Sequence, residues 1–334
     1  MFRYFGSKAS TAQGVADLAL EGLHSATVAD AFGGIGNIGA AFKRRNCQVT
    51  TCDLLDVPNA FQHTRLVCQR IPHFGKVREE LQLDSIDSVL AALNGTSRAS
   101  SWFVREYSEQ RNFFTAGNAV RIGSTWATLC RWNKRGLLSE NERKYLIASF
   151  INSVDACANT AGTYYAYLKT WHRKALRPFE MSFFPIETGF KAGQALKGDA
   201  LECLRGKSFD VLYLDPPYNA RDYSRYYHLP ETLAGLRPLK IDIESKAGQP
   251  FVRADKGPAI RKAMHLSYLT ELISSVKWKR LVVQYADGAF IQIPQLKEAL
   301  ACQGRLKSYE VSALGYMSKN GTRQHKQHVF VIDA

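Results

Sequence analysis

The sequence predicts an α/β fold around a parallel sheet, and three stretches carry this prediction. Residues 26–39 have the pattern of a strand, a glycine-rich turn and the start of a helix. Residues 48–53 have the pattern of a second strand, which ends in an acid. Residues 209–214 form a largely apolar run with the length of a buried strand, and two prolines just beyond it prevent its continuation. Open sheets of this kind bind ligands at the carboxyl ends of their strands.

Further elements of the same kind surround these strands. A helix is expected over Ala12–Gly22, where apolar residues recur along one side. Another buried strand is expected over Arg280–Asp287, followed by an amphipathic helix over Ile293–Cys302. The chain then predicts a hairpin that pairs Leu306–Leu314 with His325–Ile332 across an Asn-Gly turn.

The middle of the chain, residues 58–195, breaks the alternation of strands and helices. Leu81–Leu93 has a helical pattern, and Ser139–Ala158 predicts a stronger helix with acidic residues in its first turn. We therefore predict a sheet domain formed by residues 1–57 and 196–334, with an inserted, mainly helical region between them. After the sheet strand at 209–214, the stretch Lys240–Lys262 is rich in Gly, Pro and charge, which predicts a mobile loop that closes on substrate.

Composition indicates a polyanionic partner. The 334 residues carry a net charge of +14, and the pI is about 9.5. No basic amphipathic helix or lipidation signal suggests a membrane, so nucleic acid is the expected partner. The first residues lack an apolar signal core, and no run approaches the ~18 apolar residues of a membrane span, which predicts a cytoplasmic protein. The seven cysteines are scattered without a C-x-x-C pair, so we expect reduced thiols and no metal site.

Within the inserted region, cations and aromatic residues alternate in a way typical of nucleic-acid surfaces, where cations bind phosphates and flat side chains stack on bases. Many of the aromatic residues are expected to lie in the core, so the region as a whole, and not any single residue, is expected to contact nucleic acid. The set is Arg98, Trp102, Phe103, Arg105, Tyr107, Arg111, Phe113, Phe114, Arg121, Trp126, Arg131, Trp132, Lys134 and Arg135. The nearby stretch Asn159–Lys169, with three tyrosines, is expected to pack the insertion onto the main domain; lining a groove is the alternative.

The strongest functional signal follows the strand at 209–214. Asp215, Pro216, Pro217 and Tyr218 combine a carboxylate, a proline carbonyl and an aromatic ring at a forced turn. An exocyclic amine on a base is a poor nucleophile because its lone pair is delocalised into the ring. Two acceptors, Asp215 and the Pro216 carbonyl, would draw its nitrogen toward tetrahedral geometry, and Tyr218 would stack on the base. The pattern therefore indicates chemistry on the amino group of a planar base.

A second set of residues is suited to a cofactor. Asp30, Phe32, Gly34 and Gly36 form the pattern Asp-x-Phe-x-Gly-x-Gly after a strand, and glycines let the backbone pass close beneath a ligand. The spacing is not that of a nucleotide-phosphate loop. Asp53 ends the next strand, where an acid can hold ribose hydroxyls.

Two more charged residues extend this set. Lys8 stands near the start of the first helix, a place where a cofactor carboxylate can bind with the lysine as counter-charge. Asp199 follows Gly198 ahead of a helical turn, where its carboxylate can accept a hydrogen bond from an adenine amino group; capping that turn is the alternative role.

Together these segments resemble the Dam-type adenine-specific DNA methyltransferases, in which cofactor motifs come first, then the target-recognition region, then Asp-Pro-Pro-Tyr. The resemblance rests on the order of 4–8, 30–36, 53, 199, 215–218 and the closing hairpin along almost the whole chain. One departure is Tyr4, which stands where relatives often have tryptophan.

The resemblance implies a Rossmann-like methyltransferase fold with a mostly parallel, seven-stranded sheet, a C-terminal antiparallel hairpin and an inserted target-recognition region at 58–195. It implies that Tyr4, Lys8, the glycine loop, Asp53 and Asp199 hold S-adenosyl-L-methionine (AdoMet). It also implies that a flipped adenine meets Asp215, Pro216, Pro217 and Tyr218, without a metal and without a covalent intermediate.

The resemblance further implies double-stranded DNA as the partner, with a cognate restriction endonuclease as a candidate second partner, in a bacterial or phage-encoded system. Other planar amines remain open as substrates: cytosine N4 in DNA, a base in RNA, or a protein glutamine. A relative that binds DNA without catalysis is the other alternative.

Overall fold

The computed structural model describes residues 1–334 except 96–99, 190, 218–221, 252–256 and 319–320, and it describes no side chain between 312 and 325. The chain divides into two compact units. We call them the sheet unit, formed by 6–69, 187–222 and 256–334, and the helical unit, formed by 1–5, 70–186 and 223–255. None of the described helices combines the length and the hydrophobicity that a membrane span requires.

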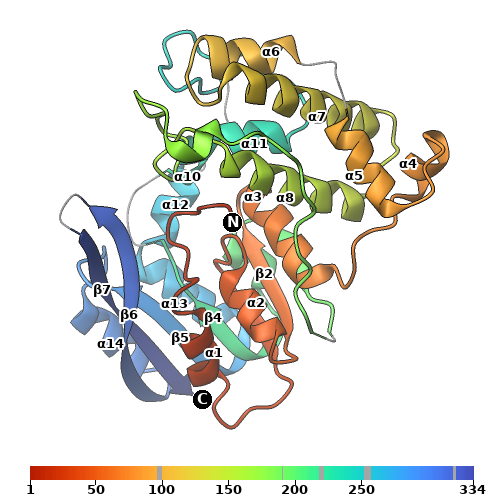
Figure 1. The fold of residues 1–334 in the computed structure, drawn as a ribbon. Coiled ribbons are helices and arrows are strands. Elements are labelled where there is room, and N and C mark those ends of the chain that lie inside the picture. Colours follow the sequence, from red (N-terminus) through yellow and green to blue (C-terminus); the bar gives the residue numbers. More distant parts are fainter. Residues whose placement is uncertain (96–99, 190, 218–221, 252–256, 319–320) are drawn as a thin grey trace. The chain divides into compact units, whose positions relative to one another are not determined.

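The sheet unit is built on a seven-stranded sheet, as predicted (Figure 1). The strand order is β3-β2-β1-β4-β5-β7-β6, with β7 antiparallel to both of its neighbours and every other pairing parallel. The bounds are β1 (Thr27–Asp30), β2 (Gln48–Asp53), β3 (Gln194–Lys197), β4 (Ser208–Leu214), β5 (Lys277–Ala286), β6 (Arg305–Ser318) and β7 (Gly321–Asp333).

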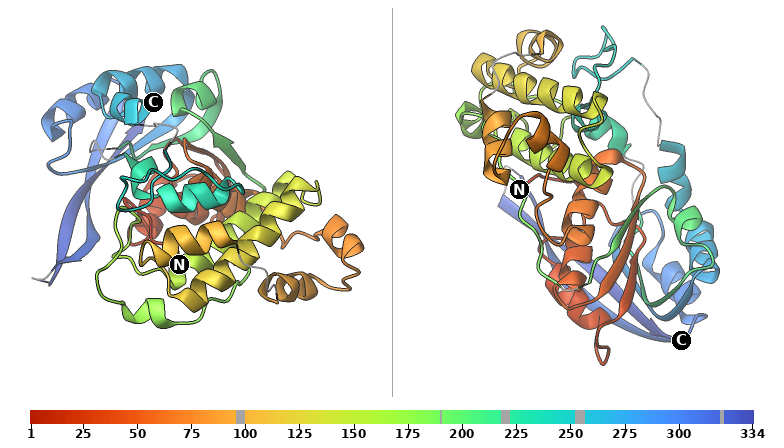
Figure 2. Two further views of the ribbon diagram at one scale, coloured as in Figure 1. Left: turned by 90° about the horizontal axis from the view of Figure 1, so that it is seen from above. Right: turned by 90° about the vertical axis from the view of Figure 1, so that its right-hand side faces the viewer.

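Both faces of the sheet are covered because side chains alternate along each strand. Val28 of β1 lies in the core under α1 (Ala12–Ala19) and α2 (Asn37–Lys43), whereas the adjacent Ala29 lies in the core on the opposite face. Figures 1 and 2 show helices on both faces. The remaining helices of the unit are α3 (Asp56–Gln62), the π-helical turn η1 (His63–Val67), α9 (Ala200–Leu204), α12 (Gly257–Ala263), α13 (Leu266–Ser275) and α14 (Ile293–Ala301).

The helical unit contains the predicted helix near 139–158, now bounded as α8 (Glu140–Ala156). Ser139 caps it with a capping box in which the Ser139 and Glu142 side chains bond each other's backbone amides. The other helices are α4 (Gly75–Glu80), α5 (Ile86–Asn94), α6 (Ser101–Val104), η2 (Arg105–Glu109), α7 (Ala116–Lys134), η3 (Arg173–Leu176), α10 (Tyr223–Tyr226) and α11 (His228–Ala234).

The two units do not follow the boundaries expected from the sequence. Residues 58–69 and 187–195 belong to the sheet unit, while 1–5 and 223–255 join the helical unit. The first residues are fixed there by tertiary contacts: the Phe2 ring is buried, and its amide donates to Asn152 Oδ1 at 2.9 Å. Such contacts between distant segments leave no periodic signal in the sequence.

The interleaved aromatic residues at 102–132 are mostly core, as expected for many of them. Phe103, Tyr107, Phe113 and Phe114 are fully buried, and Trp126 and Trp132 are no more than 2% exposed. Arg111 is also buried, and Arg98 lies outside the described residues. The last two tryptophans belong to α7, a 19-residue helix that we did not predict although its apolar residues recur at helical spacing.

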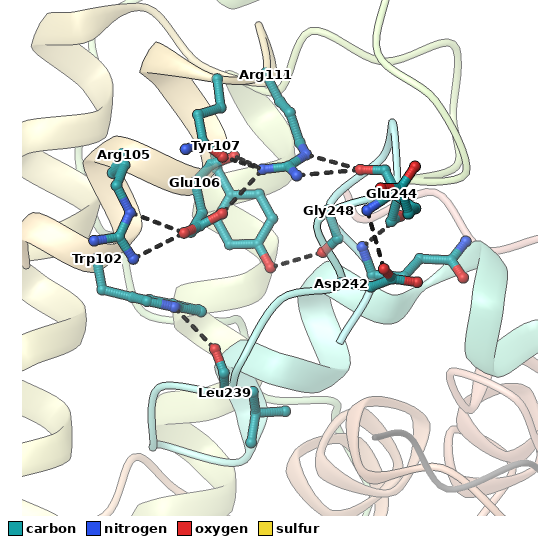
Figure 3. A network of polar contacts seen from close by, with 12 residues as sticks. Trp102, Arg105, Glu106, Tyr107, Arg111, Leu239, Asp242, Glu244 and Gly248 are labelled. Carbon is teal, nitrogen blue, oxygen red and sulfur yellow. Dashed lines mark hydrogen bonds and ion pairs between the residues drawn. The ribbon is translucent and has the colours of Figure 1, made fainter. Parts of the chain in front are cut away.

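The first part of the expected mobile loop is instead fastened to the helical unit (Figure 3). Trp102 Nε1 donates to the Leu239 carbonyl at 3.0 Å, and Tyr107 Oη donates to the Gly248 carbonyl at 3.2 Å. Arg111 donates twice to the Ser245 carbonyl, from Nε at 3.2 Å and Nη2 at 3.1 Å. Residues 239–248 are therefore held by side chains of α6, η2 and the turn that follows.

Arg111→Met should release this loop. The substitution removes both bonds to Ser245 and the ion pair at 3.0 Å with Glu106, which is only 9% exposed and then keeps only its more exposed partner, Arg105. The loss should therefore be smaller than the ~3–5 kcal/mol that leaving a buried charge without any partner costs. We expect a lower free energy of unfolding in urea and faster tryptic cleavage after Lys246.

Arg143→Met is the matched control, because Arg143 forms a more exposed pair with Glu140 within α8. Its free energy of unfolding should change by less than about 1 kcal/mol. Equal effects of the two substitutions would contradict the anchoring role of Arg111.

Candidate active site

Four neighbouring parallel strands end in, or next to, an aspartate at one edge of the sheet. Asp53 ends β2, Asp30 ends β1, Asp215 follows β4 directly, and Asp199 stands two residues beyond β3. The chain leaves β1 and β4 toward opposite sides of the sheet, so Asp30 and Asp215 flank the switch point where open α/β sheets bind ligands. The fold thus brings four of the predicted site residues to one edge.

The carboxyl group of Asp30 is costly to ionise. Its side chain is 1% exposed, and neither oxygen has a hydrogen-bond partner among the described residues. Burial, followed by the nearby charge of Asp215, raises the pKa of Asp30 to about 7. Burial also raises the pKa of Asp53 to about 7, although its Oδ1 accepts from the Leu55 amide at 3.0 Å.

Lys8 lies against Asp215. Its Nζ forms an ion pair with Asp215 Oδ2 and donates to the Gly6 carbonyl at 3.1 Å. The two side chains are only 6% and 12% exposed. Burial raises the pKa of Asp215, and the Lys8 ammonium opposes this shift. Lys8 thus favours the ionised, hydrogen-bond-accepting form of Asp215.

The glycine-rich turn between β1 and α2 is tightly packed from below. Gly34 and Gly36 have φ of 50° and 78°, a region that glycine adopts readily. A Cβ on Gly33 would lie 1.9 Å from Thr51 Oγ1 and 2.8 Å from Gln62 Nε2. Gln62 is fully buried and donates to the Gly34 carbonyl at 2.9 Å. The turn is therefore fixed in shape by β2 and α3.

Asp199 is joined to an aromatic residue from α13. Its Oδ1 accepts from Tyr268 Oη at 2.6 Å and caps α9 through the Leu201 amide at 3.0 Å. The Tyr268 ring is 6.5 Å from that of Phe32 between centroids. Burial and the bond to Asp199 raise the pKa of Tyr268. Asp199 thus caps a helix, which is the alternative role expected for it. Its carboxylate is half-buried at the sheet edge.

The remaining predicted residues have different positions. Pro216 is buried and Pro217 half-buried, directly after Asp215. Tyr218 lies outside the described residues. Tyr4 belongs to the helical unit, where its ring stacks on Tyr227 at 4.7 Å and on Tyr223 at 5.8 Å.

Three residues of this site escaped the sequence analysis. Gly33 occupies a variable position of the motif, and only the close approach of Thr51 reveals why it must lack a side chain. Gln62 and Tyr268 reach the site from α3 and α13, at no fixed spacing from any motif. Among the described residues, no group of His, Cys, Asp and Glu has the arrangement of a metal site, and all seven cysteines are free.

The fold and this edge define a class: an open α/β domain with an acidic ligand site at its switch point. Comparison with known sequences gives the family, because the model of the D12 class N6 adenine-specific DNA methyltransferases matches residues 4–238. The chain belongs to this family.

Individual relatives are methyltransferases as well. The chain is 28% identical to the type II methyltransferase M.FokI of Planomicrobium okeanokoites over 97% of its own length and 50% of the relative's. It is 24% identical to the type II methyltransferase M.NlaIII of Neisseria lactamica, over 97% of this chain and 95% of that one. M.CviAII of Paramecium bursaria Chlorella virus 1, also a type II methyltransferase, is 28% identical over 58% of this chain and 57% of its own. The chain thus spans half of the first relative and nearly all of the second.

The raised pKa of Asp30 predicts a pH effect on stability. Folding raises its pKa from 3.8 to about 7, so the folded protein keeps a proton that the unfolded chain loses. Stability should therefore fall as pH rises from about 4 to about 7 and level off above that range. Asp30→Asn, which stays neutral, should remove up to about 4 kcal/mol of this fall.

Urea denaturation of the ligand-free protein at pH 5 and pH 8 measures the effect. Glu298→Gln, on the exposed side of α14, controls for the loss of one carboxylate. If Asp30→Asn and Glu298→Gln lost the same stability between the two pH values, Asp30 would not be a buried acid.

Proposed function

We propose that this chain is an AdoMet-dependent DNA adenine methyltransferase that methylates the N6 amino group of a flipped adenine. The observation that carries the proposal is Asp215, at the end of β4 and beside the switch point. Its Oδ1 is buried without a hydrogen-bond partner among the described residues, and Pro216 follows it immediately. An unsatisfied buried acceptor is costly unless a ligand donates to it.

In the proposed reaction, Asp215 and the Pro216 carbonyl accept hydrogen bonds from the two N–H groups of the amine. This draws the nitrogen lone pair out of the ring system and aims it at the methyl group. The amine would become cationic as the new N–C bond forms and the methyl–sulfur bond of AdoMet breaks, which leaves a neutral thioether, and the amine would then lose one proton. Burial raises the pKa of Asp215, which suits this carboxylate to take that proton. Fixed acceptors need no reorganisation as charge develops.

The charge of the sheet edge supports AdoMet as the cofactor. AdoMet supplies a methyl group on a positively charged sulfonium and also carries an ammonium group. Asp30 has two buried oxygens without partners among the described residues, so a cationic ligand would offset the cost of its ionisation. We assign AdoMet binding to Lys8, Asp30, Phe32, Gly34, Gly36, Asp53, Asp199 and, from the helical unit, Tyr4.

Duplex DNA is the proposed substrate, and the net charge of +14 supports a polyanionic partner. The target adenine is paired and stacked in a duplex, so it must be flipped out, at a cost of a few kcal/mol that pocket contacts offset. Tyr218 is proposed to stack on it. The relatives are named as type II methyltransferases, which supports a cognate restriction endonuclease as partner, in the cytoplasm of a bacterium or a phage-infected cell.

The test is incubation of the purified protein with labelled AdoMet and unmethylated plasmid, followed by nucleoside analysis of the digested DNA. We expect N6-methyladenine from the wild type. Asp215→Ala should lower the rate by at least about 100-fold, because it removes an acceptor that acts on the reacting nitrogen. AdoMet binding by this variant, measured by calorimetry, should change little.

Glu298→Ala, which removes an exposed carboxylate of α14, should leave methylation at the wild-type rate. Label in N4-methylcytosine, or in RNA or protein but not DNA, would contradict the proposal. Equal activity of the wild type and Asp215→Ala would exclude Asp215 from the reaction.

A further inference from the structure

We infer that Thr11 and Gln284 are positioning residues, which fix the Lys8 ammonium on Asp215 through a buried chain of hydrogen bonds that starts in the sheet. This assignment rests on the proposed function only in taking Asp215 as the acceptor of the amine. Thr11 stands directly before α1, and Gln284 lies in β5. Neither residue bonds Asp215 directly, so both act through Lys8.

The orientation of the Asp215 carboxylate depends on Lys8. Oδ2 is paired with the Lys8 ammonium, and Oδ1 is buried without a hydrogen-bond partner among the described residues. The last torsion of an aspartate side chain is soft, so a carboxylate turns unless one of its oxygens is held. The position of Lys8 Nζ therefore decides where Oδ1, the proposed acceptor of the amine, lies.

The backbone of Lys8 is fixed by the first turn of α1. Its carbonyl accepts from the amides of Thr11 and Ala12, at 3.0 and 2.9 Å, and from the Thr11 hydroxyl at 3.3 Å. Lys8 and Thr11 are each 6% exposed. The two amides belong to the helix itself, whereas the hydroxyl is a group through which the sheet can hold this turn.

Gln284 makes that connection from β5. Its Nε2 donates to Thr11 Oγ1 at 3.3 Å and to Gln327 Oε1 of β7, and its Oε1 accepts from Tyr213 Oη of β4 at 2.6 Å. The three strands are neighbours in the order β4-β5-β7 (Figure 1). Gln284 is fully buried, and both of its N–H groups and its oxygen are used. Its amide therefore has one arrangement, which fixes the Thr11 hydroxyl.

A glutamine is not what packing alone requires at this position. Val282, two residues earlier on β5, and Val329, opposite Gln284 on β7, both belong to the apolar core beneath α1. A buried amide is costly in such surroundings unless each of its groups is bonded, and an apolar network of the same shape can be equally stable. A fully bonded polar network does specify a single arrangement. This one ends at the carbonyl of the residue that holds Asp215.

Three substitutions test the assignment. Thr11→Val keeps the shape of the side chain and removes its hydroxyl, whereas Thr11→Ser keeps the hydroxyl. Thr27→Val is the matched control, at the amino end of β1 and thus at the opposite edge of the sheet. It removes a hydroxyl that donates to Asp210 Oδ2 at 2.8 Å and accepts from the Asp210 amide at 3.0 Å. Thermal melting of each variant confirms folding.

The first measurement needs neither AdoMet nor DNA. The ligand-free protein is treated with N-hydroxysuccinimidyl acetate, and mass spectrometry gives the rate of acetylation of Lys8 relative to the exposed Lys207. Lys8 should react at least about 5-fold faster in Thr11→Val than in the wild type, because a hydrogen bond that holds its backbone is lost. Thr11→Ser and Thr27→Val should react at the wild-type rate.

The second measurement is kcat for plasmid methylation as a function of pH. Thr11→Val should lower kcat at least about 10-fold, since misplacement of a reacting group by ~1 Å can cost ~100-fold. The acid limb of its profile should move to higher pH, because a displaced Lys8 ammonium opposes the rise in the pKa of Asp215 less well. Asp30, the other charged group that acts on Asp215 among the described residues, is unchanged in every variant. Thr11→Ser should restore both kcat and the profile.

A Thr11→Val variant with the wild-type reactivity of Lys8 would overturn the assignment. Equal losses of kcat in Thr11→Val and Thr27→Val, or a Thr11→Ser variant as impaired as Thr11→Val, would overturn it as well, because loss of stability or of shape would then explain the effect. A wild type that methylates no DNA would reject the proposed function instead. Acetylation of Lys8 would then decide the positioning role by itself: a faster reaction in Thr11→Val would support it, and an unchanged one would overturn it.

Discussion

The structure depends on burying carboxylates side by side at the carboxyl edge of its sheet. Burial and the charge of Asp215 raise the pKa of Asp30 to about 7. Burial also raises the pKa of Asp215, and the ammonium of one buried cation, Lys8, opposes that rise. Such a site lowers the stability of the ligand-free fold at neutral pH, because buried charge is poorly solvated. A site that conflicts with stability in this way is expected where a ligand, and not folding, has selected the residues. The cluster is thus evidence for binding that is independent of any sequence motif.

The rest of the sheet unit serves to hold that edge. Hydrophobic residues on both faces of the strands set the register, so that Asp30 of β1 aligns with Thr51 of β2 and Tyr213 of β4. The glycine turn then lies against β2 so closely that Gly33 has no room for a Cβ. Because the strands are rigid and the turn is fixed by Gln62, the acids have one arrangement before a ligand arrives. Preorganisation of this kind lowers the cost of binding.

The sequence was sufficient wherever the signal was local. Each strand that ends in or near an acid could be identified from a run of four to seven residues, and the parallel sheet then placed Asp30, Asp53, Asp199 and Asp215 together. The other site residues and the boundaries of the two units depend on tertiary packing. Gln62 and Tyr268 lie at no fixed spacing from a motif, and the first five residues joined the helical unit through contacts such as that of Phe2 with Asn152. The boundaries of the two units therefore differ from the predicted ones, although the predicted fold class is correct.

The cations illustrate the same limit in electrostatic terms. A net charge of +14 indicates a polyanionic partner, but it does not locate the surface that binds this partner. Composition does not show which cations are buried or paired with an acid. Arg111 looks basic in the sequence, yet its guanidinium is buried and occupied by Glu106 and the Ser245 carbonyl. An arginine committed in this way cannot also neutralise a phosphate. The cations that remain available are the exposed ones that make no ion pair among the described residues, and in the helical unit these include Arg121 and Arg131 of α7.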